Sequence, residues 1–251
     1  MNQLIILLKK DLMELFRTKK FLIILILLGI FALTSPLFAK MTPEILKLLG
    51  DDIQITMLDP TIVDSYIQFV GNLSQMGIFA FIIAFSGLIV NERKKGLLTN
   101  LLNNGVTKAN FILSKVISQK IIIVIIFLIS IILFEFYNLI LFEEMFPKNS
   151  IISHIALFIY FMFIIAVTNF FSTISKSKMI GLIMSFLVVF SIMIFDLVSF
   201  GKYLPNYLLS ISIGVLGDGT VLDYAYINMG ITLAISLLLV ILSIKMCKNK
   251  E

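Results

Sequence analysis

Six long apolar runs divide this chain of 251 residues, and they constrain its fold more than any other feature. A helix needs about 20 apolar residues to cross a bilayer, because backbone polar groups there must be bonded within the segment. Alternating strands of about ten residues, typical of membrane β-barrels, are not seen. The sequence therefore predicts an all-α integral membrane protein with six transmembrane helices within residues 21–245. The runs are 21–39, 73–90, 118–142, 151–171, 180–200 and 224–244.

The composition agrees with this class, and the basic residues give the orientation. Apolar residues make up 59% of the chain and charged residues 14%, with a mean hydropathy of +1.07. The 20 basic residues lie at the termini and in alternate loops, with four exceptions: Lys40, Lys47, Lys148 and Lys202. By the positive-inside rule both termini are cytoplasmic, including a short tail at 246–251. We attribute the net charge of +5 to this topology and not to nucleic-acid binding.

Residues 1–20 have the pattern of an amphipathic helix that lies in the membrane interface. Leucines, isoleucine and phenylalanine cluster on one side at 100° per residue, and polar residues cluster on the other. We expect Lys9, Lys10 and Arg17 to face anionic lipid headgroups. The alternative is that this helix only orients the first span.

Two segments are predicted on the outer side. The first, residues 40–72, is the largest, and Thr42 with Pro43 is expected to begin a helix there. The second, residues 201–223, is too apolar for an ordinary loop and too short to span the bilayer, which is typical of re-entrant segments. We expect it to form one or two short helices that pack on the fifth and sixth spans and close the outer end of a path.

Residues 91–115 form a polar, basic island between the second and third runs. It begins with Glu92, Arg93, Lys94, Lys95 and Gly96. Four leucines then recur at the spacing of one face of a short helix: Leu97, Leu98, Leu101 and Leu102. Asn103-Asn104-Gly105 predicts a turn, and Thr107 an N-cap for the next helix. The alternative is a solvated charged loop, which the leucine spacing disfavours.

Motifs for catalysis and metal binding are missing from the sequence. The chain has no Walker A motif, no Gly-x-Ser-x-Gly elbow, and a single histidine, which excludes a His-Glu-x-x-His zinc site. The single Cys247 lies in the cytoplasmic tail and is expected to be an inert free thiol. We therefore expect no catalytic residues, no metal and no cofactor on this chain.

Three ionisable residues fall toward the outer ends of predicted spans: Glu135, His154 and Asp196. Such groups cost free energy in a membrane, so each is a candidate functional group. One interpretation is a polar outward-facing cavity, or a relay for protons or cations. The other, which we favour, is snorkelling to the interface or neutral carboxyl groups hydrogen-bonded between helices.

Together these features resemble the type-2 ABC transporter permeases, the membrane subunits of bacterial ATP-driven exporters. Four features carry the resemblance across essentially the whole chain. They are the basic amphipathic helix before the first span, the segment after the second span, the six-span layout with both ends inside, and the apolar, proline-containing segment before the last span. Two details depart from the common pattern. Leu97 stands where a small hydroxyl residue is usual, and Asn103-Asn104-Gly105 replaces a proline-containing turn.

The resemblance implies that residues 91–115 hold a coupling helix seated in a groove of a separate ATPase subunit. Glu92 and the basic triplet 93–95 would supply complementary charge, the four leucines apolar contacts, and Gly96 a bend. Two ATPase copies would bind ATP and magnesium, and a second permease copy or a paralogue would complete the path. Membrane lipids are the remaining expected partner, and the expected location is the bacterial cytoplasmic membrane.

The only sequence feature that indicates a substrate class is the composition of the predicted membrane interior. An apolar, nearly uncharged interior favours hydrophobic or amphipathic cargo, such as antimicrobial or cytolytic peptides. Drugs, lipid-linked sugars and sodium are the alternative substrates. The alternative function is a self-contained small membrane channel or transporter, or an intramembrane enzyme. Copurification of a Walker-motif ATPase, or its gene beside this one, would separate the two hypotheses.

Overall fold

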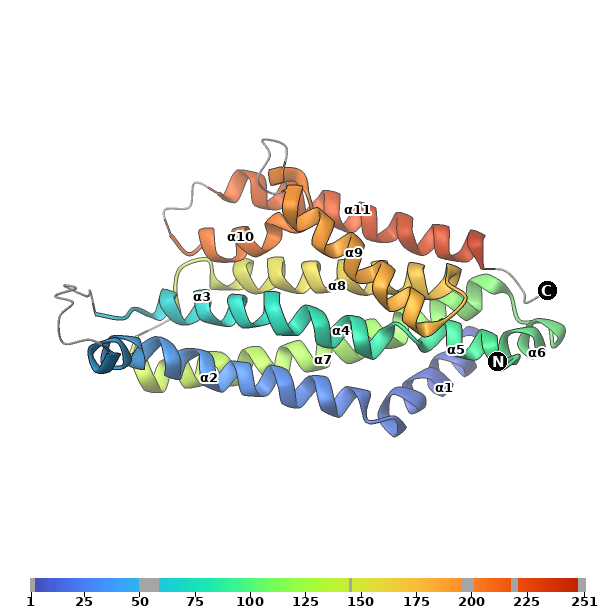
Figure 1. Ribbon diagram of the computed structural model, residues 1–251, viewed down its shortest axis with the longest axis horizontal. Helices are drawn as coiled ribbons and strands as arrows, with labels where there is room; N and C mark the ends of the chain where they lie inside the picture. Colours follow the sequence, from blue (N-terminus) through green and yellow to red (C-terminus); the bar gives the residue numbers. More distant parts are fainter. Residues whose placement is uncertain (1–2, 50–58, 145, 196–200, 218–220, 248–251) are drawn as a thin grey trace.

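The computed structural model describes residues 3–49, 59–144, 146–195, 201–217 and 221–247, and in these ranges it is helical with no strand. Long helices lie side by side along one axis (Figure 1). Five are long and apolar enough to cross a membrane: Lys20–Ile45, Ile62–Lys94, Lys108–Phe142, Ser150–Ile174 and Tyr224–Met246. The chain is therefore a multi-pass membrane protein.

The elements follow one another in a simple order along the chain. The first half contains α1 (Gln3–Arg17), α2 (Lys20–Leu49), α3 (Ile62–Asn72), a π-helical turn η1 (Leu73–Gly77), α4 (Ile78–Phe85), α5 (Leu88–Lys94) and α6 (Leu97–Asn103). The second half contains α7 (Lys108–Phe142), α8 (Ser150–Ile174), α9 (Lys178–Phe195), a 3₁₀ turn η2 (Gly201–Tyr203), α10 (Tyr207–Gly214) and α11 (Leu222–Met246).

The fifth of the six predicted spans differs from the expectation. The apolar run 180–200 corresponds to α9, which has 18 described residues and is shorter than the five long helices. At 1.5 Å per residue it is about 27 Å long, slightly less than the hydrocarbon core. Residues 196–200, which include Asp196, lie outside the described part of the chain. Among the described residues, five helices are thus long and apolar enough to span a membrane, and one further apolar helix is shorter.

The predicted outer segment 40–72 also differs, because its two flanks belong to long helices. Helix α2 continues through Pro36 and Pro43 to Leu49, and Thr42 donates its hydroxyl to the Phe38 carbonyl at 2.7 Å. Thr42 therefore lies inside a helix and does not cap a new one. Proline lacks an N–H, so the helix loses a backbone bond there but continues. The second spanning helix begins far earlier than residue 73, at Ile62.

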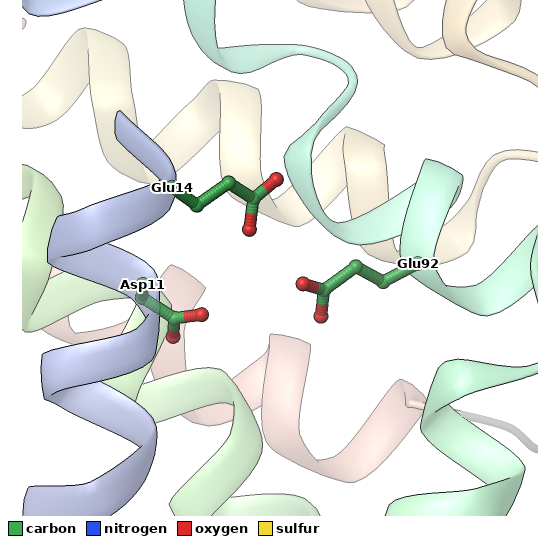
Figure 2. Close-up of side chains that lie close together, drawn as sticks. All are labelled: Asp11, Glu14 and Glu92. Atoms are coloured by element: carbon green, nitrogen blue, oxygen red, sulfur yellow. The ribbon is translucent and has the colours of Figure 1, made fainter. Parts of the chain in front are cut away.

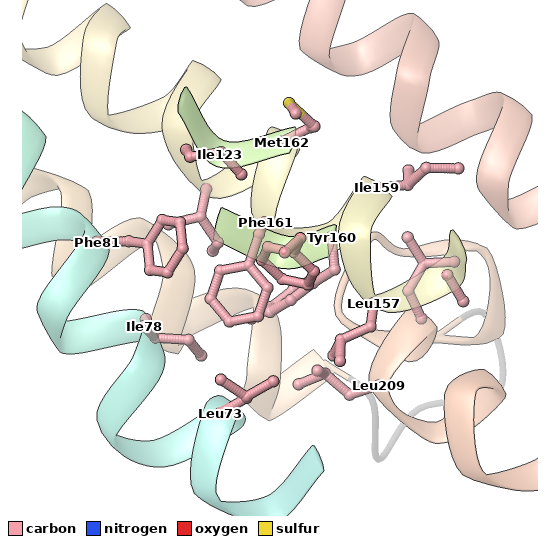
Figure 3. Close-up of a cluster of buried hydrophobic side chains, with 14 of the residues drawn as sticks. Leu73, Ile78, Phe81, Ile123, Leu157, Ile159, Tyr160, Phe161, Met162 and Leu209 are labelled. Carbon is pink, nitrogen blue, oxygen red and sulfur yellow. The ribbon is translucent and has the colours of Figure 1, made fainter. Parts of the chain in front are cut away.

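The hydrophobic core is centred on α8. This helix packs against α4, α5, α7, α9, α10 and α11 and is the most deeply buried of the spans. Figure 3 shows Phe81 of α4 and Phe161 of α8 facing each other, with ring centroids 4.6 Å apart. Large aliphatic residues elsewhere, such as Ile132 and Ile151, are exposed. An apolar surface of this kind is the surface that contacts lipid.

The short helices expected between the last two spans are present as η2 and α10. They pack mainly on α8, α11 and α3. The sequence had predicted packing on the fifth and sixth spans, and of these the sixth, α11, is among the main contacts. Asn228 of α11 donates to the carbonyls of Lys202 and Leu204 at 2.8 and 2.9 Å. Ser153 of α8 donates to the Ser212 carbonyl at 2.5 Å. Side chains of α8 and α11 thus bond backbone carbonyls of this segment.

Replacing Asn228 by leucine should lower stability measurably. The substitution keeps the branched shape of the side chain but leaves the Lys202 carbonyl without its donor, whereas the Leu204 carbonyl still accepts the Tyr207 N–H at 3.1 Å. A buried unsatisfied group costs about 1–3 kcal/mol. We expect a lower unfolding temperature for the purified chain in nanodiscs. Asn100→Leu, at an exposed position on α6, is the matched control. Equal unfolding temperatures for the two variants would contradict the role given to Asn228.

Candidate coupling site

Two short helices, α5 and α6, connect the second spanning helix to α7. Gly96 joins them with a positive φ of 74°, a conformation that glycine adopts without strain. Gly105, with φ 81°, ends the following turn. The Thr107 hydroxyl accepts the Asn110 N–H at 3.1 Å and caps α7. The predicted short helix, turn and cap are therefore all present, at the end of the bundle where α1 begins and α11 ends (Figure 1).

The leucine face of α6 packs on this chain itself, which differs from the expected contact with a partner. Leu98 is fully buried in a small core formed with Ile89, Phe111 and Val240. Leu101 and Leu102 are half-buried against the same core, and Leu97 is 40% exposed. The exposed residues of α5, α6 and the junction between them are Asn91, Lys94, Lys95, Leu97, Asn100 and Asn103.

Arg93 is bound inside the chain and is not a free surface cation. Its guanidinium donates to the carbonyls of Thr173 and Ser175 at the C-terminal end of α8. The last carbonyls of a helix have no intrahelical partner, and the helix dipole favours a cation there. Arg93 therefore fixes α5 to the end of the central helix.

Glu92 lies in a buried cluster of charges that links α1, α5 and α7. We call Lys10, Asp11, Glu14, Glu92 and Lys115 the inner ion cluster. The Lys115 Nζ lies 2.8 Å from an Asp11 oxygen, 2.7 Å from a Glu92 oxygen and 3.3 Å from a Glu14 oxygen. The Lys10 Nζ lies 2.6 Å from the same Glu92 oxygen. Figure 2 shows the three carboxylates converging from α1 and α5.

The inner ion cluster changes the interpretation of α1. The polar side of this helix, predicted to face the headgroups, instead places Asp11 in the interior against Lys115 and the Ser114 hydroxyl. Lys9 and Arg17 remain exposed, and Lys10 is half-buried. Ile5, Ile6 and Phe16 are exposed on α1, so the helix keeps an apolar surface suited to a membrane interface.

Asp11, Glu14 and Glu92 have the composition of a cation site. Their nearest oxygens all lie within 4.8 Å of one another. The Lys115 ammonium, however, contacts all three carboxylates and supplies the positive charge that a metal ion would bring. The arrangement therefore has the chemistry of a structural ion-pair network.

A second group of polar side chains lies near the other end of the bundle. We call Ser65, Tyr66, Glu135, Asn138 and His154 the outer polar cluster. One Glu135 oxygen accepts the Tyr66 hydroxyl and lies 2.5 Å from His154 Nε2. Ser65 donates to the Asn138 side chain at 2.5 Å. The second Glu135 oxygen and the Asn138 amide nitrogen are buried and have no hydrogen-bond partner among the described residues.

The outer polar cluster contains two residues that the sequence singled out and one contact residue that it missed. Glu135 and His154 were both singled out, and the structure brings them together as a hydrogen-bonded contact between α7 and α8. Tyr66 was missed because residues 40–72 were assigned to an outer loop. Asp196 lies outside the described residues.

The single cysteine, Cys247, is almost fully buried at the end of α11. Burial raises the pKa of its thiol, so less of the reactive thiolate is present at neutral pH. Its environment is therefore that of the unreactive thiol expected from the sequence.

Comparison with known proteins gives a membrane-protein relative and no finer assignment. No family model matches the chain. The chain is 27% identical over 147 residues to the "Uncharacterized transmembrane protein YxlG" of Bacillus subtilis (strain 168). The match covers 57% of this chain and 57% of that relative, so the chain spans little more than half of the relative's length. Similarity and structure agree on a multi-pass membrane protein.

Proposed function

We propose that this chain is the permease subunit of an ABC exporter, driven by a separate ATPase subunit. The observation that carries the proposal is the bracing of α5 and α6. Arg93 ties α5 to the end of α8, and the inner ion cluster ties α5 to α1 and α7. A force applied to this segment would be transmitted to three helices because its supports are buried and charged.

The proposed contact with the ATPase is smaller than the one expected from the sequence. Glu92, Arg93 and Leu98 are occupied within the chain, so the proposed contact consists of Lys94, Lys95 and the exposed Leu97. Two lysines beside one apolar side chain would suit an acidic groove with an apolar floor. ATP and magnesium would bind on the partner, and this chain would have no catalytic role.

The remaining layout follows the same proposal. Helix α9 would be the fifth of six spans, and both termini would lie in the cytoplasm of a bacterial cell. The segment 201–223 would close the outer end of the path. Two permease chains, identical or paralogous, would combine with two ATPase subunits.

An amphipathic substrate fits the apolar surface between α7 and α8. A groove of about 340 Å³ lies there, lined mainly by aliphatic and aromatic side chains, with His154 as its polar member. Hydrophobic or amphipathic molecules, such as antimicrobial peptides, could enter such a groove sideways from the bilayer.

Affinity purification from native membranes tests the assignment. The tagged full-length chain should recover an ATPase with a Walker motif. Lys94→Glu with Lys95→Glu should reduce that recovery about tenfold, since reversing two interfacial charges costs on the order of 1.4 kcal/mol or more. The control is Lys40→Glu with Lys148→Glu, at exposed positions late in α2 and just before α8. Absence of an ATPase, or equal recovery by both variants, would contradict the proposal.

A second candidate function is a self-contained transporter, which the outer polar cluster favours. A buried carboxylate with one unpartnered oxygen is a costly feature in a membrane and is typical of ion or proton pathways. Transport by the purified chain alone in sealed vesicles would support this candidate against the first.

A further inference from the structure

A hollow of about 600 Å³ lies between α1, α2, α5 and α9, beside the start of α6. Its lining is unusually basic for so small a space. Five cationic side chains from four helices line it: Lys10, Arg17, Lys20, Lys95 and Lys178. Two acidic side chains, Glu14 and Glu92, lie on the same wall.

Among the described residues, the two carboxylates pair with one of these five cations, Lys10. Glu92 is already bound to Lys10 and Lys115, and Glu14 contacts Lys115. The other four cations are Arg17, Lys20, Lys95 and Lys178. Within the described ranges, no carboxylate oxygen lies within 4.0 Å of their nitrogen atoms. The hollow therefore holds an excess of positive charge that an anion would balance.

The position of the hollow indicates a ligand at the membrane surface. Lys20 and Lys178 are the first residues of α2 and α9, so both lie where apolar helices leave the bilayer. Exposed apolar side chains follow within one turn, including Ile23 and Met179. Met13 of α1 also lines the hollow. A ligand with an anionic headgroup and hydrocarbon chains would match basic side chains that are followed along the helices by an apolar surface.

We propose that the hollow binds the phosphate headgroup of an anionic phospholipid. The lysines and Arg17 hold the headgroup, and the acyl chains lie along α2 and α9. The bound lipid joins α1 and α2 to α5 and α9 through charges that would otherwise repel one another. The site requires only that the chain spans a membrane, so it does not depend on the ATPase assignment.

Lipid retention tests the site directly. The full-length chain is placed in nanodiscs of phosphatidylcholine with or without phosphatidylglycerol, and retained lipid is measured by native mass spectrometry together with the unfolding temperature. We expect preferential retention of phosphatidylglycerol and a higher unfolding temperature in its presence. Lys20→Gln with Lys178→Gln should reduce the preferential retention about tenfold. The matched control is Lys40→Gln with Lys148→Gln.

A second pair of substitutions and a phosphate control complete the experiment. If Lys20→Gln with Lys178→Gln unfolds in phosphatidylcholine alone, Arg17→Gln with Lys95→Gln is used, since both side chains are exposed. Inorganic phosphate is added to phosphatidylcholine nanodiscs, and protection equal to that of phosphatidylglycerol would show a free-phosphate site and overturn the lipid proposal. Equal retention of the two lipids, or retention unchanged by the substitutions, would also overturn it. If the basic residues instead serve an acidic partner protein, phosphatidylglycerol has no effect.

Discussion

Replacing Lys115 by methionine should destabilise the folded protein by about 3–5 kcal/mol, the usual cost of removing one partner from a buried ion pair. Lys115 is 2% exposed and contacts carboxylates of Asp11, Glu14 and Glu92. Methionine keeps most of the aliphatic volume, so the loss comes from the charge. With Lys115 gone, Asp11 and Glu92 remain buried, and among the described residues Lys10 is the one cation that still contacts them.

The unfolding temperature in nanodiscs and the rate of tryptic cleavage measure this effect. Cleavage after Arg17 and Lys19 should accelerate, because Asp11 then no longer ties α1 to α7. Lys120→Met is the control, since Lys120 lies on the same helix and forms no ion pair with the described residues. Equal stability of the two variants would show that the cluster contributes little.

A compensated variant separates charge from packing. Lys115→Met combined with Asp11→Asn and Glu92→Gln removes the excess negative charge that the single substitution leaves. It should recover a large part of the lost stability, because replacing a whole buried ion network is often nearly neutral. Failure to recover would indicate that Lys115 acts through its packing.

Local features of residues 91–115 were predictable from sequence because neighbouring residues determine them. The helix of four leucines, the turn at Asn103-Asn104-Gly105 and the Thr107 cap all depend on contacts within a few residues. The direction of the leucine face was not predictable, because leucine spacing shows that a face is buried but not what covers it. Here the cover is the chain's own α7 and α11, through Phe111 and Val240.

The inner ion cluster could not be predicted, because its members are far apart in sequence. Asp11 and Lys115 are 104 residues apart, and on α1 a helical pattern alone places Asp11 on the polar side. Tertiary packing buries part of this polar side, because Asp11 contacts the buried Lys115 there. Composition likewise placed Tyr66 in an outer loop. Thr61 followed three residues later by Asp64 is an N-capping pattern, and Thr61 N–H does donate to Asp64 at 2.8 Å. That signal predicts a helix starting at Ile62.

The outer polar cluster should be the second region where one substitution has a large effect. Glu135→Leu removes the acceptor shared by the Tyr66 hydroxyl and His154, and stranding each group should cost about 1–3 kcal/mol. Glu135→Gln keeps the shape and one acceptor oxygen, so it should be much milder. Glu144→Leu, at an exposed position just beyond α7, is the control for a change of charge alone.

The single histidine makes the contact measurable apart from stability. Isotope labelling of histidine gives one imidazole signal, from His154, because the chain has no other histidine. That signal should move in Glu135→Leu and in Tyr66→Phe, and it should stay in place in Glu144→Leu. An unchanged signal in Glu135→Leu would show that α7 and α8 do not meet through these side chains. A signal that moves while the unfolding temperature holds would mean that the contact exists but contributes little, so the stability of this end would rest on the aromatic packing of Tyr66 and Phe134, whose ring centroids lie 4.9 Å apart.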